Sequence, residues 1–347
     1  MLKLINFSSN VIFGNNVISS IPNEIESKRF SKEIIFISGE KTFKLIGEKI
    51  LNKIQANDLR VVENIIGIRK DKDIVDNYIS KFSKDKKYTI ISVGSGSVLD
   101  IGKYIASETN SPLISIPTSL STDAIATSFS VLWRKGSSIA IKTVAPSLVI
   151  GDYQLLKNED KRFIKAGIGD MLSKLSALYD WRLSFWLAKE KYNDFAYKLA
   201  SYITKLIIER LYHILNADYI GIETLFLAEV TDGYLMELAD TTRVAAGSEH
   251  LFSFAMESLG SNLLHGELCG LGTIMMYFLQ TGSHRAKKIF EKIQFPITTR
   301  ELGISKEIII KALTISHKMR NWYTILGKDG LTEAQAERLA KYTGVIE

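Results

Sequence analysis

Short runs of apolar residues alternate with segments of helical spacing over roughly the first 150 residues. The run Glu33–Ser38 is apolar almost throughout and ends before a glycine, which is typical of a strand buried on both faces. Lys41–Ile54 and Asp71–Phe82 carry apolar residues three and four positions apart, which predicts amphipathic helices. Further strands are predicted at Val61–Val62, Tyr88–Val93, Pro112–Ile116 and Leu148–Ile150. This alternation predicts a parallel sheet that binds ligands at the carboxyl ends of its strands.

The pattern changes between Phe129 and Val144, where two short strand-like runs flank a glycine-containing loop at residues 134–137 and predict a β-hairpin. From about residue 153 onwards, strand signals nearly vanish and long amphipathic helices follow one another. We therefore expect a Rossmann-like α/β nucleotide-binding domain over residues 1–152 and an all-α domain over residues 153–347. The site is expected in the cleft between them.

The amino-acid composition excludes several classes of protein. One cysteine among 347 residues excludes a disulfide framework and a Cys-based zinc ribbon, and it suits a reducing compartment. The net charge is +6, but the lysine-rich segments 69–72 and 84–87 alternate with acids, as solvated helix ends do. No apolar stretch approaches the roughly 20 residues of a membrane span, and the N-terminus lacks an apolar signal region. We expect a cytoplasmic protein that binds no nucleic acid.

The segment Gly94–Asp100 follows a predicted strand and opens a predicted helix. Two glycines let the backbone approach a ligand closely, and the N–H groups at a helix start attract phosphate. The segment therefore fits a pyrophosphate cradle. A tight strand-to-helix turn with Gly94 at positive φ explains the same residues equally well.

The segment 117–123 follows the next predicted strand and should lie at the same edge of the sheet. Thr118 and Ser121 offer hydroxyls to a cofactor, and Asp123 could accept a hydrogen bond from a substrate hydroxyl. The simpler alternative, favoured when the segment is taken alone, is a loop in which Asp123 is the N-cap of a helix over Ala124–Ser128.

Metal ligands must come from few residues, since the chain has five histidines. His250, His265 and Asp170 lie far apart in the sequence, so no local metal motif is present, and each alone favours a structural role. Cys269 lies one helical turn after His265 and could be a fourth ligand, although a small core residue is the better interpretation.

Taken together, six segments resemble the iron-type alcohol dehydrogenase and dehydroquinate synthase-like superfamily, and within it most closely the archaeal glycerol-1-phosphate dehydrogenases. They are residues 11–16, 94–103, 117–123, 167–181, 247–250 and 265–273. The resemblance implies a dehydroquinate synthase-like fold and a homo-oligomer. It also implies zinc-dependent, NAD(P)H-linked reduction of dihydroxyacetone phosphate to sn-glycerol 1-phosphate, the backbone of archaeal ether lipids.

The resemblance also implies the site residues. Zinc would be held by Asp170, His250 and His265, with Asp123 and Asp170 contacting the substrate. One carboxylate and two imidazoles leave an open position, as in a catalytic zinc site. The implied contacts to NAD(P) are Gly94, Gly96, Ser97, Val98, Leu99, Asp100, Thr118, Ser119, Leu120, Ser121 and Thr127.

Two positions depart from the family pattern. Phe254 stands where relatives commonly have a histidine that faces the substrate, so this side chain can line the pocket but cannot form a hydrogen bond. Ser95 stands where glycine is more usual. Candidate cations for the substrate phosphate are Lys142, Arg243 and Lys174.

Three other functions stay open. A glycerol or polyol dehydrogenase of the same superfamily shares several motifs. A dehydroquinate synthase is less favoured because that family's Gly-Gly-Lys segment does not follow residue 123. A non-catalytic nucleotide-binding paralogue is suggested by Phe254 but disfavoured by the intact metal ligands. Preference between NAD and NADP is also open, since Glu40 could accept from a ribose hydroxyl or simply begin a helix.

Overall fold

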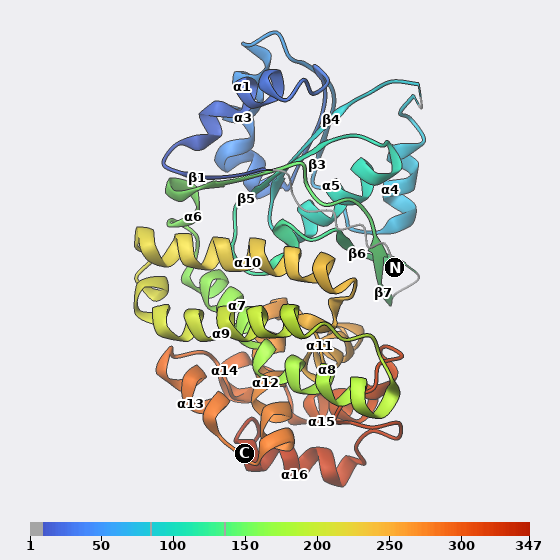
Figure 1. Ribbon diagram of the computed structural model, residues 1–347, viewed down its shortest axis with the longest axis vertical. Coiled ribbons are helices and arrows are strands. Elements are labelled where there is room, and N and C mark those ends of the chain that lie inside the picture. Colours follow the sequence, from blue (N-terminus) through green and yellow to red (C-terminus); the bar gives the residue numbers. More distant parts are fainter. Residues whose placement is uncertain (1–9, 84, 135–136) are drawn as a thin grey trace. The chain divides into compact units, whose positions relative to one another are not determined.

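The structure is a computed structural model that describes residues 10–83, 85–134 and 137–347 (Figure 1). The chain forms two compact units. The first contains the residues up to Glu159 together with Ala217–Glu237, and the second contains Asp160–Asn216 and Leu238–Glu347. Most of helix α10 (Tyr219–Ala239) therefore folds with the first unit, whereas the expected boundary at residue 152 places it in the second.

Aromatic packing accounts for this position of α10. The Phe226 ring of α10 lies 5.2 Å from that of Phe13, and a Cβ on Gly151 would lie 2.7 Å from the Phe226 ring. The helix therefore packs directly on two adjacent strands of the sheet, in a place where only glycine leaves room for the ring.

Six parallel strands form the sheet of the first unit, in the order β1-β8-β5-β4-β2-β3. They are β1 (Asn10–Gly14), β2 (Glu33–Ser38), β3 (Arg60–Ile66), β4 (Thr89–Gly94), β5 (Leu113–Pro117) and β8 (Leu148–Asp152). The expected parallel sheet is confirmed. Strand β1 escaped the sequence analysis because it is an edge strand with no fully buried residue.

Both faces of the sheet are covered, which explains why β2 is apolar at every central position. Ile34 and Phe36 contribute to a core shared with η1 (Val17–Ser20), α1 (Ile21–Ser27), η2 (Phe43–Gly47) and α3 (Glu48–Gln55). Ile35 and Ile37 point to the opposite core, shared with α4 (Lys72–Ile79) and α5 (Gly96–Glu108). Successive strand residues alternate between faces, so a strand with helices on both sides needs a continuous apolar run.

The predicted hairpin is present as the antiparallel pair β6 (Phe129–Arg134) and β7 (Ser137–Lys142). Its tip at residues 135–136 lies outside the described residues. Three short helical elements complete this unit: α2 (Glu40–Thr42), η3 (Asp123–Ile125) and α6 (Tyr153–Leu156).

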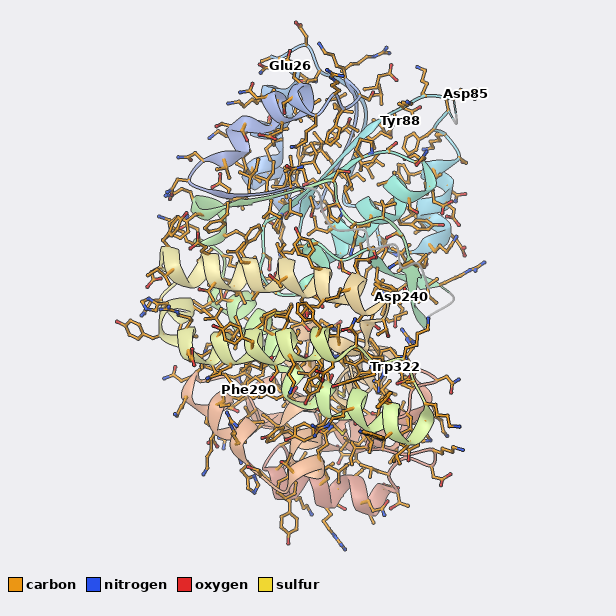
Figure 2. All side chains as sticks on the ribbon, in the orientation of Figure 1. Glu26, Asp85, Tyr88, Asp240, Phe290 and Trp322 are labelled. Carbon is orange, nitrogen blue, oxygen red and sulfur yellow. The ribbon has the colours of Figure 1, made fainter. Side chains whose placement is uncertain are left out.

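The second unit consists of helices. They are α7 (Lys161–Leu172), α8 (Lys174–Ala188), α9 (Asp194–Leu215), η4 (Thr242–Val244), α11 (Ser248–Ser258), α12 (His265–Thr281), α13 (Arg285–Lys292), α14 (Thr299–Leu302), α15 (Lys306–Ile315), η5 (Ser316–Lys318) and α16 (Glu333–Thr343). Phe290 lies in its interior, with its ring 4.8 Å from that of Phe295 (Figure 2). Among the described residues, every helix is too short or too polar to cross a bilayer.

Helix α12 crosses α7 and α11 at backbone contact. A Cβ on Gly266 would overlap the carbonyl oxygen of Ala166, and one on Gly169 would overlap the carbonyl of Gly266. On the α11 side, a Cβ on Gly272 would lie 2.7 Å from the carbonyl oxygen of Glu249. These three glycines let the helices approach closely enough for their side chains to form one compact group.

Candidate active site

Helices α7, α11 and α12 bring together Asp170, His250, His265 and Cys269. One potential ligand atom from each of the four lies within 4.8 Å of all the others. Nε2 of His250 lies 3.6 Å and Nε2 of His265 lies 4.0 Å from the same carboxylate oxygen of Asp170. Cys269 Sγ lies 3.5 Å from Nε2 of His265. His265 and Cys269 lie one turn apart on α12, but Asp170 and His250 join them only through tertiary packing, which is why residue spacing alone does not reveal the group.

Two glutamates orient the imidazoles. Nδ1 of His250 lies 3.0 Å from a carboxylate oxygen of Glu249, and Nδ1 of His265 lies 3.0 Å from one of Glu257. Since a carboxylate accepts, each Nδ1 carries the proton and each Nε2 is directed to the centre of the group. Carboxylate–imidazole pairs of this kind are typical of metal sites. Sequence reasoning missed both glutamates; the adjacency of Glu249 to His250 was the only available signal.

The group is buried but accessible from one side. Asp170 and His250 are 2% and 6% exposed, whereas the His265 side chain is 30% exposed. Burial alone would raise the pKa of Asp170, but the adjacent His250, whose Nε2 lies 3.6 Å away, and the charges of His265 and Lys174 hold it well below its ordinary value. A carboxylate, two oriented imidazoles and a thiol form a donor set that fits a divalent metal such as zinc.

Cys269 combines two features. Its side chain is fully buried, as expected of a small core residue. Its Sγ also belongs to the group of potential ligand atoms. Cys269 is therefore both a core residue and a potential metal ligand.

Phe254 lies beside both histidines. Its ring centroid is 6.0 Å from that of His250 and 6.3 Å from that of His265, nearly parallel to the latter. The guanidinium of Arg320 lies over the Phe254 ring, 4.6 Å from its centroid. The sequence analysis did not consider Arg320.

In the first unit, the two expected cofactor segments lie side by side at the carboxyl edge of the sheet. Gly94 pairs with Pro117 in adjacent strands, and the Thr118 N–H donates to the Gly94 carbonyl at 3.0 Å. The expected tight strand-to-helix turn is present, since β4 ends at Gly94 and α5 begins at Gly96. The expected positive φ at Gly94 is wrong. A side chain is excluded for another reason, since a Cβ there would lie 2.7 Å from Val98.

The start of α5 fits a phosphate-bearing ligand. Gly96 and Ser97 are its first residues, so their N–H groups have no intrahelical acceptor. A Cβ on Gly96 would lie 2.5 Å from Thr122 Cγ2, so only glycine lets the start of α5 pack this closely against the segment 117–123. The N–H groups of Val98 and Leu99, by contrast, already donate to the Ser95 carbonyl.

The other expected cofactor contacts differ in whether their polar groups already have partners within the protein. Within the part of the chain that the structure describes, the Ser119 hydroxyl oxygen is buried without a hydrogen-bond partner, which makes it available to a polar ligand. The Leu120 N–H donates to the Glu159 carboxylate, the Asp100 carboxylate pairs with Lys103 at 2.8 Å, and Thr127 Oγ1 accepts from Phe129 N–H. Ser121 is 9% exposed.

Asp123 begins a single 3₁₀ turn, Asp123–Ile125, with Thr122 at the N-cap. The alternative in which Asp123 caps a helix over Ala124–Ser128 is therefore wrong. The turn ends early because the Ile125 carbonyl accepts from Ser115 Oγ of strand β5 and the chain enters β6 at Phe129.

Comparisons with known proteins agree with this architecture. The family model described as iron-containing alcohol dehydrogenase matches residues 12–158. Proteins named glycerol-1-phosphate dehydrogenase (NAD(P)+) are similar over nearly the whole chain. The one from Sulfolobus acidocaldarius is 37% identical, over 99% of this chain and 98% of the relative. The one from Pyrococcus furiosus is 34% identical, over 99% of this chain and 100% of the relative.

Solved structures share the fold at low sequence identity. A probable glycerol dehydrogenase from Sinorhizobium meliloti 1021 matches with a TM-score of 0.77 at 16% identity, over 99% of this chain and 98% of the other. Glycerol dehydrogenase from Schizosaccharomyces pombe matches with a TM-score of 0.73 at 19% identity, over 99% and 90%. The expected dehydroquinate synthase-like fold class is thereby confirmed.

Proposed function

The chain belongs to the glycerol-1-phosphate dehydrogenase family within the iron-containing alcohol dehydrogenases, and from that premise we propose that it reduces dihydroxyacetone phosphate to sn-glycerol 1-phosphate with NAD(P)H. The observation that most supports the proposal is the convergence of Asp170, His250 and His265 on one point. The product would supply the backbone of ether lipids.

Asp170, His250 and His265 would hold a zinc ion. When bound, zinc would supply Lewis-acid polarisation of the C2 carbonyl of the substrate. Glu249 and Glu257 keep the proton of each imidazole on Nδ1, so that Nε2 stays available as a ligand atom. The 30% exposure of His265 provides the side from which a substrate carbonyl would enter.

The first unit would bind NAD(P). We assign the pyrophosphate to the N–H groups of Gly96 and Ser97, because the helix start carries partial positive charge. Ser119 Oγ would donate to the cofactor, since it is buried and has no hydrogen-bond partner among the described residues. Asp123 would accept a hydrogen bond from a substrate hydroxyl. The remaining implied contacts, including Thr118, Leu120, Ser121 and Thr127, belong to the same edge or the loop that follows it.

The test is oxidation of NADH and NADPH by the zinc-loaded protein with dihydroxyacetone phosphate, with dihydroxyacetone as the matched substrate without phosphate. We expect turnover with the phosphorylated substrate and, by chiral analysis, sn-glycerol 1-phosphate as product. Reaction with glycerol and dihydroxyacetone alone would instead identify a polyol dehydrogenase. Zinc and NADH binding without turnover of either substrate would identify a non-catalytic paralogue.

A further inference from the structure

A positive charge lies next to the metal-ligand group on the side occupied by Phe254. Arg320 follows η5, is half-buried, and places its guanidinium over the Phe254 ring. That ring in turn lies 6.0 Å from the His250 ring. The two distances together place the guanidinium no more than about 11 Å from the His250 imidazole.

This separation suits a small phosphorylated substrate. With bonds of about 1.5 Å, the phosphorus of dihydroxyacetone phosphate lies about 4 to 5 Å from its carbonyl oxygen. A metal–oxygen bond adds about 2 Å, and an arginine–phosphate hydrogen bond adds about 2.8 Å. A carbonyl at the metal therefore leaves the phosphate within reach of Arg320.

Arg320 also has partners, since its Nη1 donates to the Met319 carbonyl at 2.9 Å and the Glu257 carboxylate lies near it. Its position over Phe254, beside the metal-ligand group, distinguishes it from the three cations expected for this role. Those three are held in contacts elsewhere. Arg243 pairs with Glu190, donates to the carbonyls of Ala246 and Tyr323, and stacks on Trp322, which is labelled in Figure 2. Lys174 is 1% exposed, and its charge acts on Asp170. Lys142 belongs to the hairpin of the first unit and pairs with Glu237 at 2.8 Å.

Arg320 has the chemistry of a phosphate ligand. Its planar guanidinium can donate two parallel hydrogen bonds to phosphate oxygens, which a lysine cannot. A guanidinium over an aromatic ring is attracted to the face of that ring, which restricts where the cation lies. Burial lowers the pKa of Arg320 and the Glu257 carboxylate raises it, so the guanidinium is a partly desolvated cation beside a negative charge.

We propose that Arg320 binds the phosphate group of the substrate and that Phe254 is the positioning residue that orients its guanidinium. This inference rests on the proposed function and names its specificity-determining residue. It also gives Phe254 a role, since its flat ring faces the guanidinium of Arg320.

The experiment compares zinc-loaded wild type, Arg320→Gln and Arg320→Lys with dihydroxyacetone phosphate and with dihydroxyacetone. Binding of orthophosphate is measured in parallel by calorimetry. Arg182→Gln is the matched control, because Arg182 is an exposed arginine of the same unit that also lies over aromatic rings, those of Tyr179 and Tyr197. Zinc content and thermal melting are recorded for every variant.

We expect Arg320→Gln to lower kcat/KM for dihydroxyacetone phosphate by about 10- to 100-fold, the range of a charge-assisted hydrogen bond, mainly through KM. Its activity with dihydroxyacetone should stay within about threefold, and orthophosphate binding should weaken by at least about tenfold. Arg320→Lys should recover part of the lost kcat/KM for dihydroxyacetone phosphate and part of the lost orthophosphate affinity. Phe254→Leu should raise KM for dihydroxyacetone phosphate by about three- to tenfold without changing zinc content.

Equal losses with both substrates would overturn the inference, because Arg320 would then act only by balancing Glu257. Unchanged orthophosphate affinity in Arg320→Gln would also overturn it. Failure of the proposed function looks different: wild type would then not reduce dihydroxyacetone phosphate at all, whereas the orthophosphate measurement would still decide whether Arg320 binds phosphate.

Discussion

Replacing Glu257 with glutamine tests whether the carboxylates behind the histidines support metal binding. Glutamine keeps the shape of the side chain and an acceptor for the His265 Nδ1 proton but removes the negative charge. The imidazole then becomes a weaker ligand. Changes to such partners typically lower metal affinity about 10- to 100-fold, or roughly 1.4–2.7 kcal/mol.

The structure places Glu257→Gln at the lower end of this range. Ser253 Oγ lies 3.2 Å from the same Nδ1 and stays as a second partner, so we expect a loss of about tenfold. Glu249→Gln should cost about 100-fold. Oε1 of the fully buried Glu249 accepts from both His250 Nδ1 and the Gly247 N–H. Its Oε2 is buried with no hydrogen-bond partner among the described residues, so the NH2 group of a glutamine there would be buried without an acceptor.

The assay is the zinc dissociation constant, measured by competition with a chromogenic chelator at fixed pH. The control is Glu337→Gln on α16, which removes an exposed glutamate paired with Lys341 and should not change zinc affinity. Zinc affinity that is unchanged in both Glu257→Gln and Glu249→Gln would refute the view that these carboxylates act on the metal through the imidazoles.

Three further changes test other parts of the site. His265→Ala should lower zinc content and turnover together while the fold persists; full activity in the metal-free variant would contradict the ligand assignment. Gly96→Val should raise the cofactor KM by about 10- to 100-fold through overpacking against Thr122. A rise in substrate KM alone would place the cofactor elsewhere. Phe254→His should keep kcat/KM for dihydroxyacetone phosphate within about tenfold or raise it, because the imidazole retains a flat ring for Arg320 and adds a hydrogen-bonding group. Loss of zinc in that variant would show that the ligand set is wrong.

The sheet could be predicted where burial imposes a pattern. Strand β2 is apolar at consecutive positions because helices cover both its faces, and its predicted bounds match the structure. Strand β1 and helix α10 could not be assigned in the same way. The first has a short, half-buried sequence, and the packing of the second depends on aromatic contacts with Phe13 and Gly151 that are remote in sequence.

The candidate site was predictable only through resemblance. Asp170 and His250 have no local spacing that indicates a metal site, and motifs shared with a family supplied the link. The resemblance did not identify the residues that contact the ligand side chains or lie next to them. Glu257 and Arg320 became visible only when tertiary packing placed one behind His265 and the other over Phe254.

The backbone contact between α7 and α12 bears on how freely this chain can vary. Metal–ligand bonds tolerate shifts of only about 0.2 Å, and any side chain on Gly169 or Gly266 would push apart the helices that carry Asp170 and His265. In a saturation library selected for enzyme activity, variants with any residue other than glycine at these two positions, alanine included, should therefore be lost. The loss should be as strong as for variants of the metal ligands. Gly282 differs: a Cβ there would meet no atom within 4 Å, and only its positive φ restricts it, so asparagine should survive the same selection.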